Sequence, residues 1–119
     1  MSFRFQRLDI WKESIILGKE CFIISENLRK DKYYSFSDQL LRASLSISNN
    51  IAEGSGSATK KDFANFLNIS RRSIFECANI IIILYECNLI APDSRDQMLE
   101  SFKNLSAKIY YFRKTLLSE

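Results

Sequence analysis

The feature that most limits the fold of this chain is its scarcity of turn-forming residues, with three glycines and one proline among 119 residues. Glycine and proline are the residues that most often interrupt a helix or a strand. With so few of them, the regular elements must be long and the connections few. Hydrophobic residues make up 46% of the chain and charged residues 26%, as in ordinary globular domains. We therefore expect a single domain, residues 1–119, without a second one.

Apolar residues recur every three or four positions in four segments, which is the spacing of amphipathic helices. The segments cover about residues 10–29, 36–53, 60–88 and 93–117. The last segment is the most regular, because its apolar residues alternate steps of four and three as in antiparallel bundles: Met98, Phe102, Leu105, Ile109, Phe112 and Leu116. No segment alternates in the manner of a strand. The sequence predicts an all-α fold, an antiparallel up-down-up-down four-helix bundle.

The stretch "NNIAEGSGSATKKDF", from Asn49 to Phe63, has the small residues and lysines of a phosphate-binding loop. A Walker loop, however, places its lysine directly after the second glycine, and this stretch does not. Gly54 stands where the second helix is expected to end, at a position that commonly has positive φ. Thr59 and Asp62 have the spacing of a helix-capping pair. We interpret the stretch as a hinge between two helices.

The chain contains no histidine. This absence excludes mixed-ligand zinc sites, Ser-His and Cys-His nucleophile pairs, and imidazole acid–base catalysis. Glu53 and Glu76 alone are too few carboxylates for a metal site. The three cysteines lie in apolar segments and form no C-x-x-C pair, so we expect them to be buried and reduced, as in a cytosolic protein: Cys21, Cys77 and Cys87. We expect no catalytic residue, no metal and no cofactor.

The apolar run from Ile80 to Tyr85 is far shorter than the ~20 residues that cross a bilayer. The N-terminus, "MSFRFQRLDIWKE", lacks the continuous apolar core of a secretory signal. We therefore expect a cytoplasmic protein without membrane contact. A helix that is apolar on every face needs partners on more than one side, so the run also predicts an oligomer interface, with four candidate residues: Ile80, Ile82, Ile83 and Tyr85.

Polar residues interrupt the apolar stripes of the second and third segments. Arg42, Ser46, Asn50 and Glu53 are separated by four, four and three positions, so they share one helical face. If this face meets the third helix, Arg42 and Glu76 could form a charge-assisted pair. One interpretation is a binding or catalytic cluster. We favour the other, a structural polar network that sets helix register, formed by Arg42, Asn50, Glu53, Ser73 and Glu76.

Aromatic residues lie beside basic ones in the last helix, where Tyr110, Tyr111 and Phe112 precede Arg113 and Lys114. Such residues stack bases and hold phosphates in nucleic-acid-binding proteins. They also fill bundle cores and snorkel at helix ends, and a net charge of +3 favours anions only slightly. The candidate nucleic-acid contacts are Lys60, Lys61, Arg71, Arg72, Arg113 and Lys114. For the four in the third helix, a simple solvated face is the alternative.

Several motifs of this chain resemble one protein family. The segments "QLLRAS", "SNNIAEGSG", "KKDFANFL" and "SRRSIFE" occur in this order between Asp38 and Ile81, and "LDIWKES" stands near the start. They resemble the signature of the bacterial four-helix-bundle proteins encoded within intervening sequences of 23S rRNA genes. The characteristic positions of that signature correspond to Arg42, Asn50, Glu53, Gly54, Phe66, Ser73 and Glu76. The fold is similar to that of the accessory variability determinant protein of diversity-generating retroelements.

The resemblance implies a ring-forming homopentamer without an established enzymatic activity. On this basis we expect a non-enzymatic, cytoplasmic bacterial scaffold that contacts RNA or an RNA-handling partner. The alternative is a protein–protein adaptor without nucleic-acid binding, whose grooves accept a partner helix.

Overall fold

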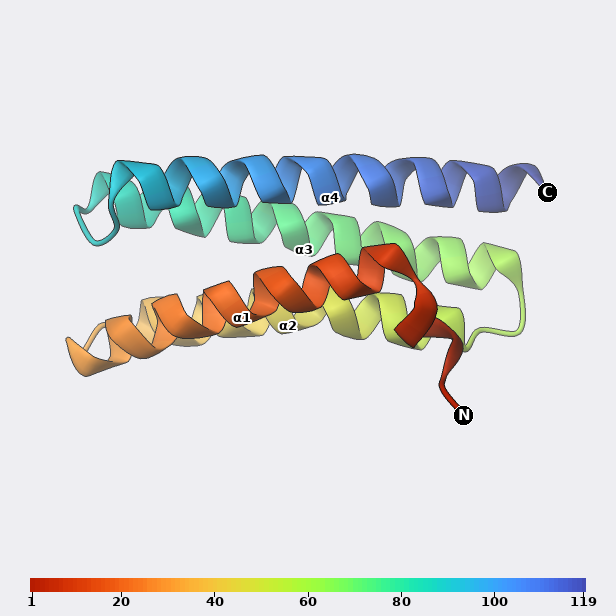
Figure 1. The fold of residues 1–119 in the computed structure, drawn as a ribbon, viewed down its shortest axis with the longest axis horizontal. Helices are drawn as coiled ribbons and strands as arrows, with labels where there is room; N and C mark the ends of the chain where they lie inside the picture. The colour runs from red at the N-terminus through yellow and green to blue at the C-terminus, as the bar shows by residue number, and fades with distance from the viewer.

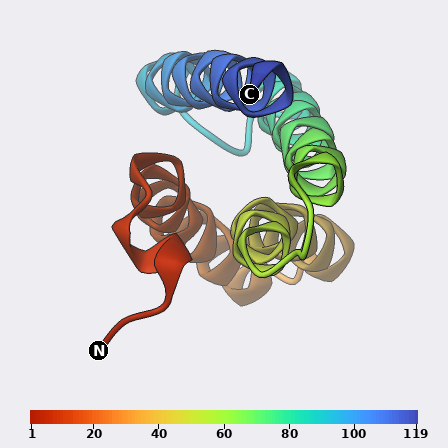
Figure 2. The ribbon, with the colours of Figure 1, turned by 90° about the vertical axis from the view of Figure 1, so that its right-hand side faces the viewer.

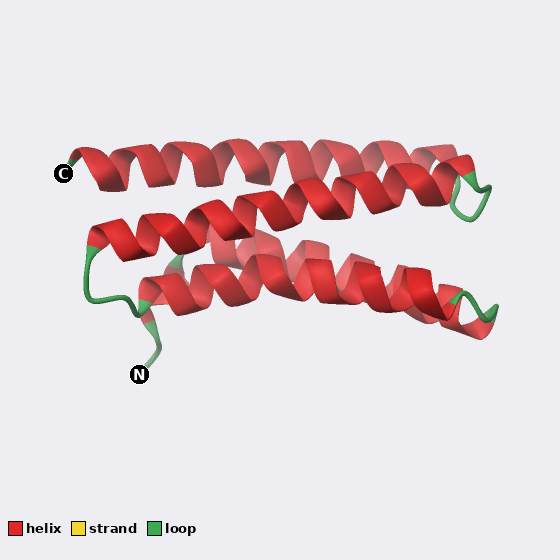
Figure 3. Cartoon of the chain, turned by 180° about the vertical axis from the view of Figure 1, so that it is seen from behind, coloured by secondary structure: helices red, strands yellow, loops and turns green.

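The computed structural model describes all residues, 1–119, and contains four long helices and no strand. The helices are α1 (Asp9–Lys30), α2 (Tyr34–Ser55), α3 (Lys60–Glu86) and α4 (Pro92–Ser118), and a short 3-10 helix, η1 (Arg4–Arg7), precedes them. Successive helices run in opposite directions (Figure 1), and the connections between them are short (Figure 3). The predicted all-α four-helix bundle is confirmed, and each helix end lies within two residues of its expected position.

The four helices follow one another around the bundle in the order of the sequence, as an end-on view shows (Figure 2). The most extensive contact is between α2 and α3, followed by the α1/α2 and α3/α4 pairs. Among helices that are adjacent in the bundle, the first and the last contact each other least. Each helix therefore packs mainly on its neighbours in the chain.

The core is built from apolar side chains at helical spacing, with 21 residues buried in one cluster. In α4, the predicted seam is buried at every position except Phe112, which is half-buried. The Phe112 ring packs edge-on against Phe63 of α3, with ring centroids 5.6 Å apart. Complete burial of a side chain such as Phe102 or Ile109 stabilises the fold by about 1.5–3 kcal/mol, so this core is the main source of stability.

The hinge between α2 and α3 differs from the sequence-based expectation at Gly54. This residue lies inside α2 and is buried, and no glycine of the chain has a positive φ. A Cβ placed on Gly54 would lie 2.7 Å from the Phe66 Cβ and 2.8 Å from Phe63 Cδ1. The prediction of a left-handed helix end was wrong here, because the glycine instead permits close contact between two helices. The Thr59 hydroxyl does cap α3, accepting from the Asp62 amide at 3.1 Å.

Two other helices end with a residue in the left-handed region, and neither residue is glycine. Lys32, after α1, has φ 67°, and Asn88, after α3, has φ 60°. In each case the backbone amide of the following residue donates a hydrogen bond to the carbonyl oxygen of the residue five positions before it, with an N···O distance of 2.8 Å. This bond is typical of a Schellman motif. These motifs close the ends of α1 and α3.

Two of the three cysteines lie in the core, as expected, and all three are free thiols. Hydrogen bonding with the Cys21 thiol, together with burial, raises the pKa of the Cys77 thiol above its ordinary value. Cys87 is exposed, which contradicts the expectation of burial, because this residue lies just past the end of α3. None of the four α-helices has a stretch that is both long and apolar enough to span a membrane.

Candidate nucleic-acid interface

Arg71 of α3 is held between two aromatic rings on the surface shared by α3 and α4. Its guanidinium carbon lies 5.1 Å from the ring centroid of Phe75, one turn further along α3, and 5.3 Å from that of Tyr110 on α4. The Arg71 Nε also donates to the Ser106 carbonyl at 3.3 Å. Cation–π attraction favours this stacked geometry. Arg71 thus joins the two helices and orients both rings.

Both rings remain accessible, with 57% of Phe75 and 46% of Tyr110 exposed. Arg72 precedes Phe75 by three positions and Lys114 follows Tyr110 by four, so each exposed cation lies one helical turn from a ring. The Arg113 Nε donates to the Ala64 carbonyl of α3 at 2.9 Å. We call this surface the basic–aromatic face; its residues are Arg71, Arg72, Phe75, Lys103, Tyr110, Arg113 and Lys114.

The basic–aromatic face lies in a part of the bundle with no acidic residue of its own. Neither residues 63–75 of α3 nor residues 101–118 of α4 include an aspartate or a glutamate. The five cations of the face form no ion pair, since the four ion pairs of the protein involve Arg29, Lys60, Arg95 and Lys108. Glu76 borders the face without forming an ion pair. Unpaired cations gathered in this way attract phosphate groups.

The six predicted nucleic-acid contacts separate into two groups in the structure. Arg71, Arg72, Arg113 and Lys114 belong to the basic–aromatic face, and the other two are Lys60 and Lys61 at the start of α3. Lys60 is paired with Glu119, with its Nζ 2.8 Å from a carboxylate oxygen. A hydrogen bond from Lys60, and its charge, lower the pKa of the exposed Glu119 carboxyl. Lys61 is exposed and forms no ion pair.

Three residues of the face are not among the six predicted contacts: Phe75, Lys103 and Tyr110. The sequence places Tyr110 beside the cations as an aromatic residue, whereas Phe75 and Lys103 are not predicted for this face. The sequence nevertheless carries a signal for each of these two. Phe75 stands four residues after Arg71, and Lys103 lies in the long acid-free stretch between Glu100 and Glu119. Helical spacing places Arg71 and Phe75 on one side of α3, but the sequence does not reveal which phenylalanines reach solvent.

The predicted polar network is present between α2 and α3 only in its small side chains. The hydroxyls of Ser46 and Ser73 are 2.8 Å apart across the two helices. The Asn50 amide nitrogen donates to the Ser46 carbonyl at 2.7 Å and lies 3.0 Å from the Ser46 hydroxyl. The Ser70 hydroxyl donates to the Ile47 carbonyl at 2.8 Å. The bonds of Ser73 and Ser70 connect α2 with α3, whereas those of Asn50 lie within α2. Together they leave these hydroxyls satisfied.

The charged members of the predicted network do not join these bonds. Arg42, Glu53 and Glu76 are exposed, and none of them forms an ion pair. The charge-assisted pair of Arg42 and Glu76, which we expected if the two helix faces met, is therefore absent. Both side chains extend toward solvent. Arg42 and Glu53 instead line an open groove of about 490 Å³ along α2, together with Asn50.

The four candidate interface residues occupy different environments. Ile80 is buried in the core of the subunit, whereas Ile82 and Ile83 are 42% and 37% exposed. Tyr85 is half-buried beneath Arg95, whose guanidinium carbon lies 3.9 Å from the ring centroid. Ile82 also lines an apolar groove of about 350 Å³ between α3 and α4, next to Phe75. Ile82 and Ile83 are thus the members of this set that are free to meet another chain.

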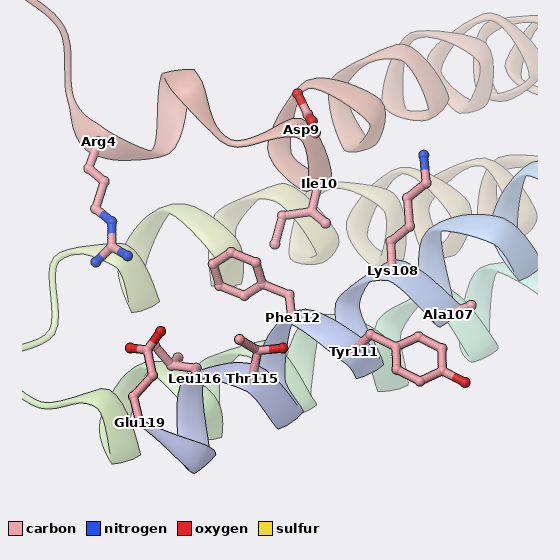
Figure 4. A pocket seen from close by; sticks show the side chains of 10 residues that line it. All are labelled: Arg4, Asp9, Ile10, Ala107, Lys108, Tyr111, Phe112, Thr115, Leu116 and Glu119. Atoms are coloured by element: carbon pink, nitrogen blue, oxygen red, sulfur yellow. The ribbon is translucent and has the colours of Figure 1, made fainter.

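A separate cleft of about 570 Å³ lies between the N-terminal segment and the end of α4 (Figure 4). Ile10 and Phe112 contribute apolar surface, and the charged lining is balanced: Arg4, Asp9, Lys108 and Glu119. The lining contains no cysteine or serine, and its hydroxyl groups are those of Tyr111 and Thr115. No group of three or more potential metal ligands occurs in the protein. No ion pair joins two of the side chains that line the cleft.

Comparison with solved structures shows the same fold in a protein of unknown function from the S23 ribosomal protein family of Bacteroides thetaiotaomicron. The two structures superpose with a TM-score of 0.84 over 88% of this chain and 98% of the other. Their sequences are 21% identical, so this likeness speaks for the fold alone. No curated protein sequence matches this chain.

The family comparison covers nearly all of the bundle. The model of the family described as 23S rRNA-intervening sequence protein matches residues 6–111, from η1 to well into α4. The matched part includes the small polar contacts between α2 and α3 and most of the basic–aromatic face. On this evidence the chain belongs to the 23S rRNA-intervening sequence protein family.

Proposed function

We propose that this protein is a non-enzymatic, homo-oligomeric scaffold that contacts RNA through its basic–aromatic face. The observation that supports RNA contact is the set of five cations that form no ion pair, on helix segments that contain no aspartate or glutamate. Phosphate groups supply the complementary charge, and the two exposed rings suit the bases beside them. The overall charge of +3 is small, so the attraction depends on this local concentration of cations.

Titration of labelled structured RNA with the protein at two salt concentrations tests this contact. Affinity should fall steeply between about 50 and 200 mM salt, because each phosphate contact releases counterions. The double variant Arg72→Gln/Lys114→Gln should bind more weakly, with a salt slope reduced by about 0.7 to 0.9 for each phosphate that is no longer neutralised. The matched control is Lys12→Gln/Lys19→Gln, which removes the same charge from exposed positions of α1. Equal weakening by both double variants would argue against the face.

The second part of the proposal is self-association, with five subunits as the resemblance to the family implies. The exposed side chains of Ile82 and Ile83 support self-association. An assembly that covers them is stabilised, because it removes their apolar surface from water. Light scattering should give a mass of about 70 kDa for five subunits of 13.9 kDa. A mass equal to one subunit at micromolar concentration would defeat this part. Ile83→Lys should lower the mass, whereas the exposed control Ile16→Lys on α1 should leave it unchanged.

The alternative function, a protein–protein adaptor without nucleic-acid binding, has its own supporting observation. The groove between α3 and α4 is lined mainly by apolar residues, among them Phe75, Ile82 and Leu99. Grooves of this kind accept the apolar side of a partner helix. If no RNA binds at either salt concentration, the adaptor becomes the better proposal.

A further inference from the structure

We infer that the basic–aromatic face is a stacking site for unpaired RNA nucleotides, with Phe75 and Tyr110 as the stacking rings. This inference rests on the proposed RNA contact and goes beyond it, because it names the form of RNA that the face selects. A surface that used cations alone would bind any strand, paired or unpaired, by its phosphates.

The first argument is the way in which the two rings are held. The guanidinium carbon of Arg71 lies 5.1 and 5.3 Å from the two ring centroids. The Arg71 Nε also donates a hydrogen bond to the backbone of α4. The rings are therefore oriented before any ligand arrives, so little side-chain freedom has to be lost on binding. About half of the surface of each of these two residues remains exposed to a ligand.

The second argument is the position of the free cations. Arg72 and Lys114 lie one helical turn from Phe75 and Tyr110, respectively, on neighbouring antiparallel helices. A base stacked on either ring thus has an unpaired cation near enough to meet its backbone phosphate. Aromatic rings that alternate with cations are the arrangement that binds single strands without sequence preference.

The third argument excludes two other ligands. The bases of a duplex are already stacked on one another, so duplex RNA has no free base face to offer these rings. An acidic peptide would satisfy the cations, but it would leave the exposed Phe75 and Tyr110 rings without a matching partner. Unpaired nucleotides are the ligand that uses both the rings and the charges.

The test compares an unstructured single-stranded RNA of about 12 nucleotides with a duplex of the same length, using the full chain. Single-stranded RNA should bind more tightly than the duplex. Phe75→Leu and Tyr110→Leu keep apolar volume but remove the rings, and each should weaken single-strand binding roughly five- to hundredfold without changing the salt slope. The matched control is Phe22→Leu on α1, an aromatic that is 51% exposed and lies outside the face. Circular dichroism confirms that each variant is folded.

A fluorescent base separates stacking from a general loss of affinity. An RNA that carries 2-aminopurine should lose fluorescence on binding the wild-type protein, because stacking quenches this base. At saturating concentrations, Tyr110→Leu should retain more of the fluorescence, and Arg72→Gln should show the same quenching as the wild type.

The possible results distinguish this inference from the proposed function. If single-stranded and duplex RNA bind equally and the ring variants have no effect, stacking is overturned while the RNA contact stands. If polyglutamate competes with the RNA and the ring variants bind both as the wild type does, stacking is overturned as well. If neither form of RNA binds at low salt, the proposed RNA contact fails and stacking fails with it.

Discussion

Gly54 of α2 lies so close to Phe66 of α3 that a Cβ on the glycine would be 2.7 Å from the phenylalanine Cβ. Gly54→Ala must therefore push the two helices apart or distort one of them. We expect this substitution to lower the free energy of unfolding by about 1–3 kcal/mol, as overpacking in a core typically does. Urea denaturation followed by circular dichroism measures the change.

Gly18 of α1 is the control for this prediction, because a Cβ there would meet no atom within 4 Å. Gly18→Ala should raise the free energy of unfolding by about 0.5–1 kcal/mol, since glycine inside a helix is costly. If Gly54→Ala and Gly18→Ala change the free energy of unfolding in the same direction, the close contact between α2 and α3 does not explain the glycine at position 54.

Lys32 has a left-handed conformation at the end of α1, with φ 67°. An L-residue with a side chain is strained there, and glycine is not. Lys32→Gly should stabilise the protein by up to about 1 kcal/mol in thermal or urea unfolding. Asn88 occupies the equivalent position after α3, but asparagine tolerates this region, so Asn88→Gly should give a smaller gain. Unchanged stability in Lys32→Gly would mean that the end of α1 is frayed in solution.

The bond between Ser46 and Ser73 predicts that the network between α2 and α3 depends on hydroxyls and not on charges. Ser73→Ala should destabilise the subunit by about 1 kcal/mol, the usual net contribution of a hydrogen bond. Arg42→Met should change stability by less than about 0.5 kcal/mol, because Arg42 is exposed and unpaired. The outcome that contradicts this account is a larger loss of stability in Arg42→Met than in Ser73→Ala.

Thiol reactivity should follow the position of each cysteine. Iodoacetamide should modify Cys87 in the folded protein, because this thiol is exposed, and should reach Cys21 and Cys77 only after unfolding. Mass spectrometry of the intact protein with and without denaturant counts the modified sites. Rapid modification of all three thiols under native conditions would show that the core opens easily.

Because the pKa of the Cys77 thiol is raised in the folded protein, the free energy of unfolding should decrease at alkaline pH. The folded thiol keeps its proton when the unfolded thiol, with an ordinary pKa of 9.0, begins to ionise. The contribution of this thiol to stability is therefore complete below about pH 9 and declines above it, by up to about 1.4 kcal/mol per pH unit. The difference in unfolding free energy between the wild type and Cys77→Ala should shrink accordingly. A difference that stays constant from about pH 8 to 10 would contradict the raised pKa.

The helices could be predicted from the sequence because apolar residues at steps of three and four leave little choice of secondary structure. Lys60 is the first residue of α3, as the sequence predicts, since Thr59 provides a local capping signal. The prediction for Gly54 is wrong because the role of this glycine depends on two phenylalanines of another helix. A local pattern contains no information about such a close approach.

The candidate sites show the same limit. Helical spacing places Ser46, Asn50 and Ser73 on facing sides of α2 and α3, and the structure joins them. The same spacing includes Arg42 and Glu76, yet these residues lie at the edge of the contact and extend into solvent. Spacing identifies a side of a helix but not the depth at which each residue lies. The stacking of Arg71 between two rings depends on the α3/α4 contact and could not be predicted from either helix alone.

The order in which the helices pack also has a consequence for how the chain reaches its fold. Because each helix contacts mainly its neighbours in the chain, most contacts join segments separated by one short turn. Little loop entropy has to be overcome before such contacts form, and chains of this topology fold within microseconds to milliseconds. We therefore expect rapid assembly by helical hairpins, with the contact between the first and last helices forming late and opening most readily.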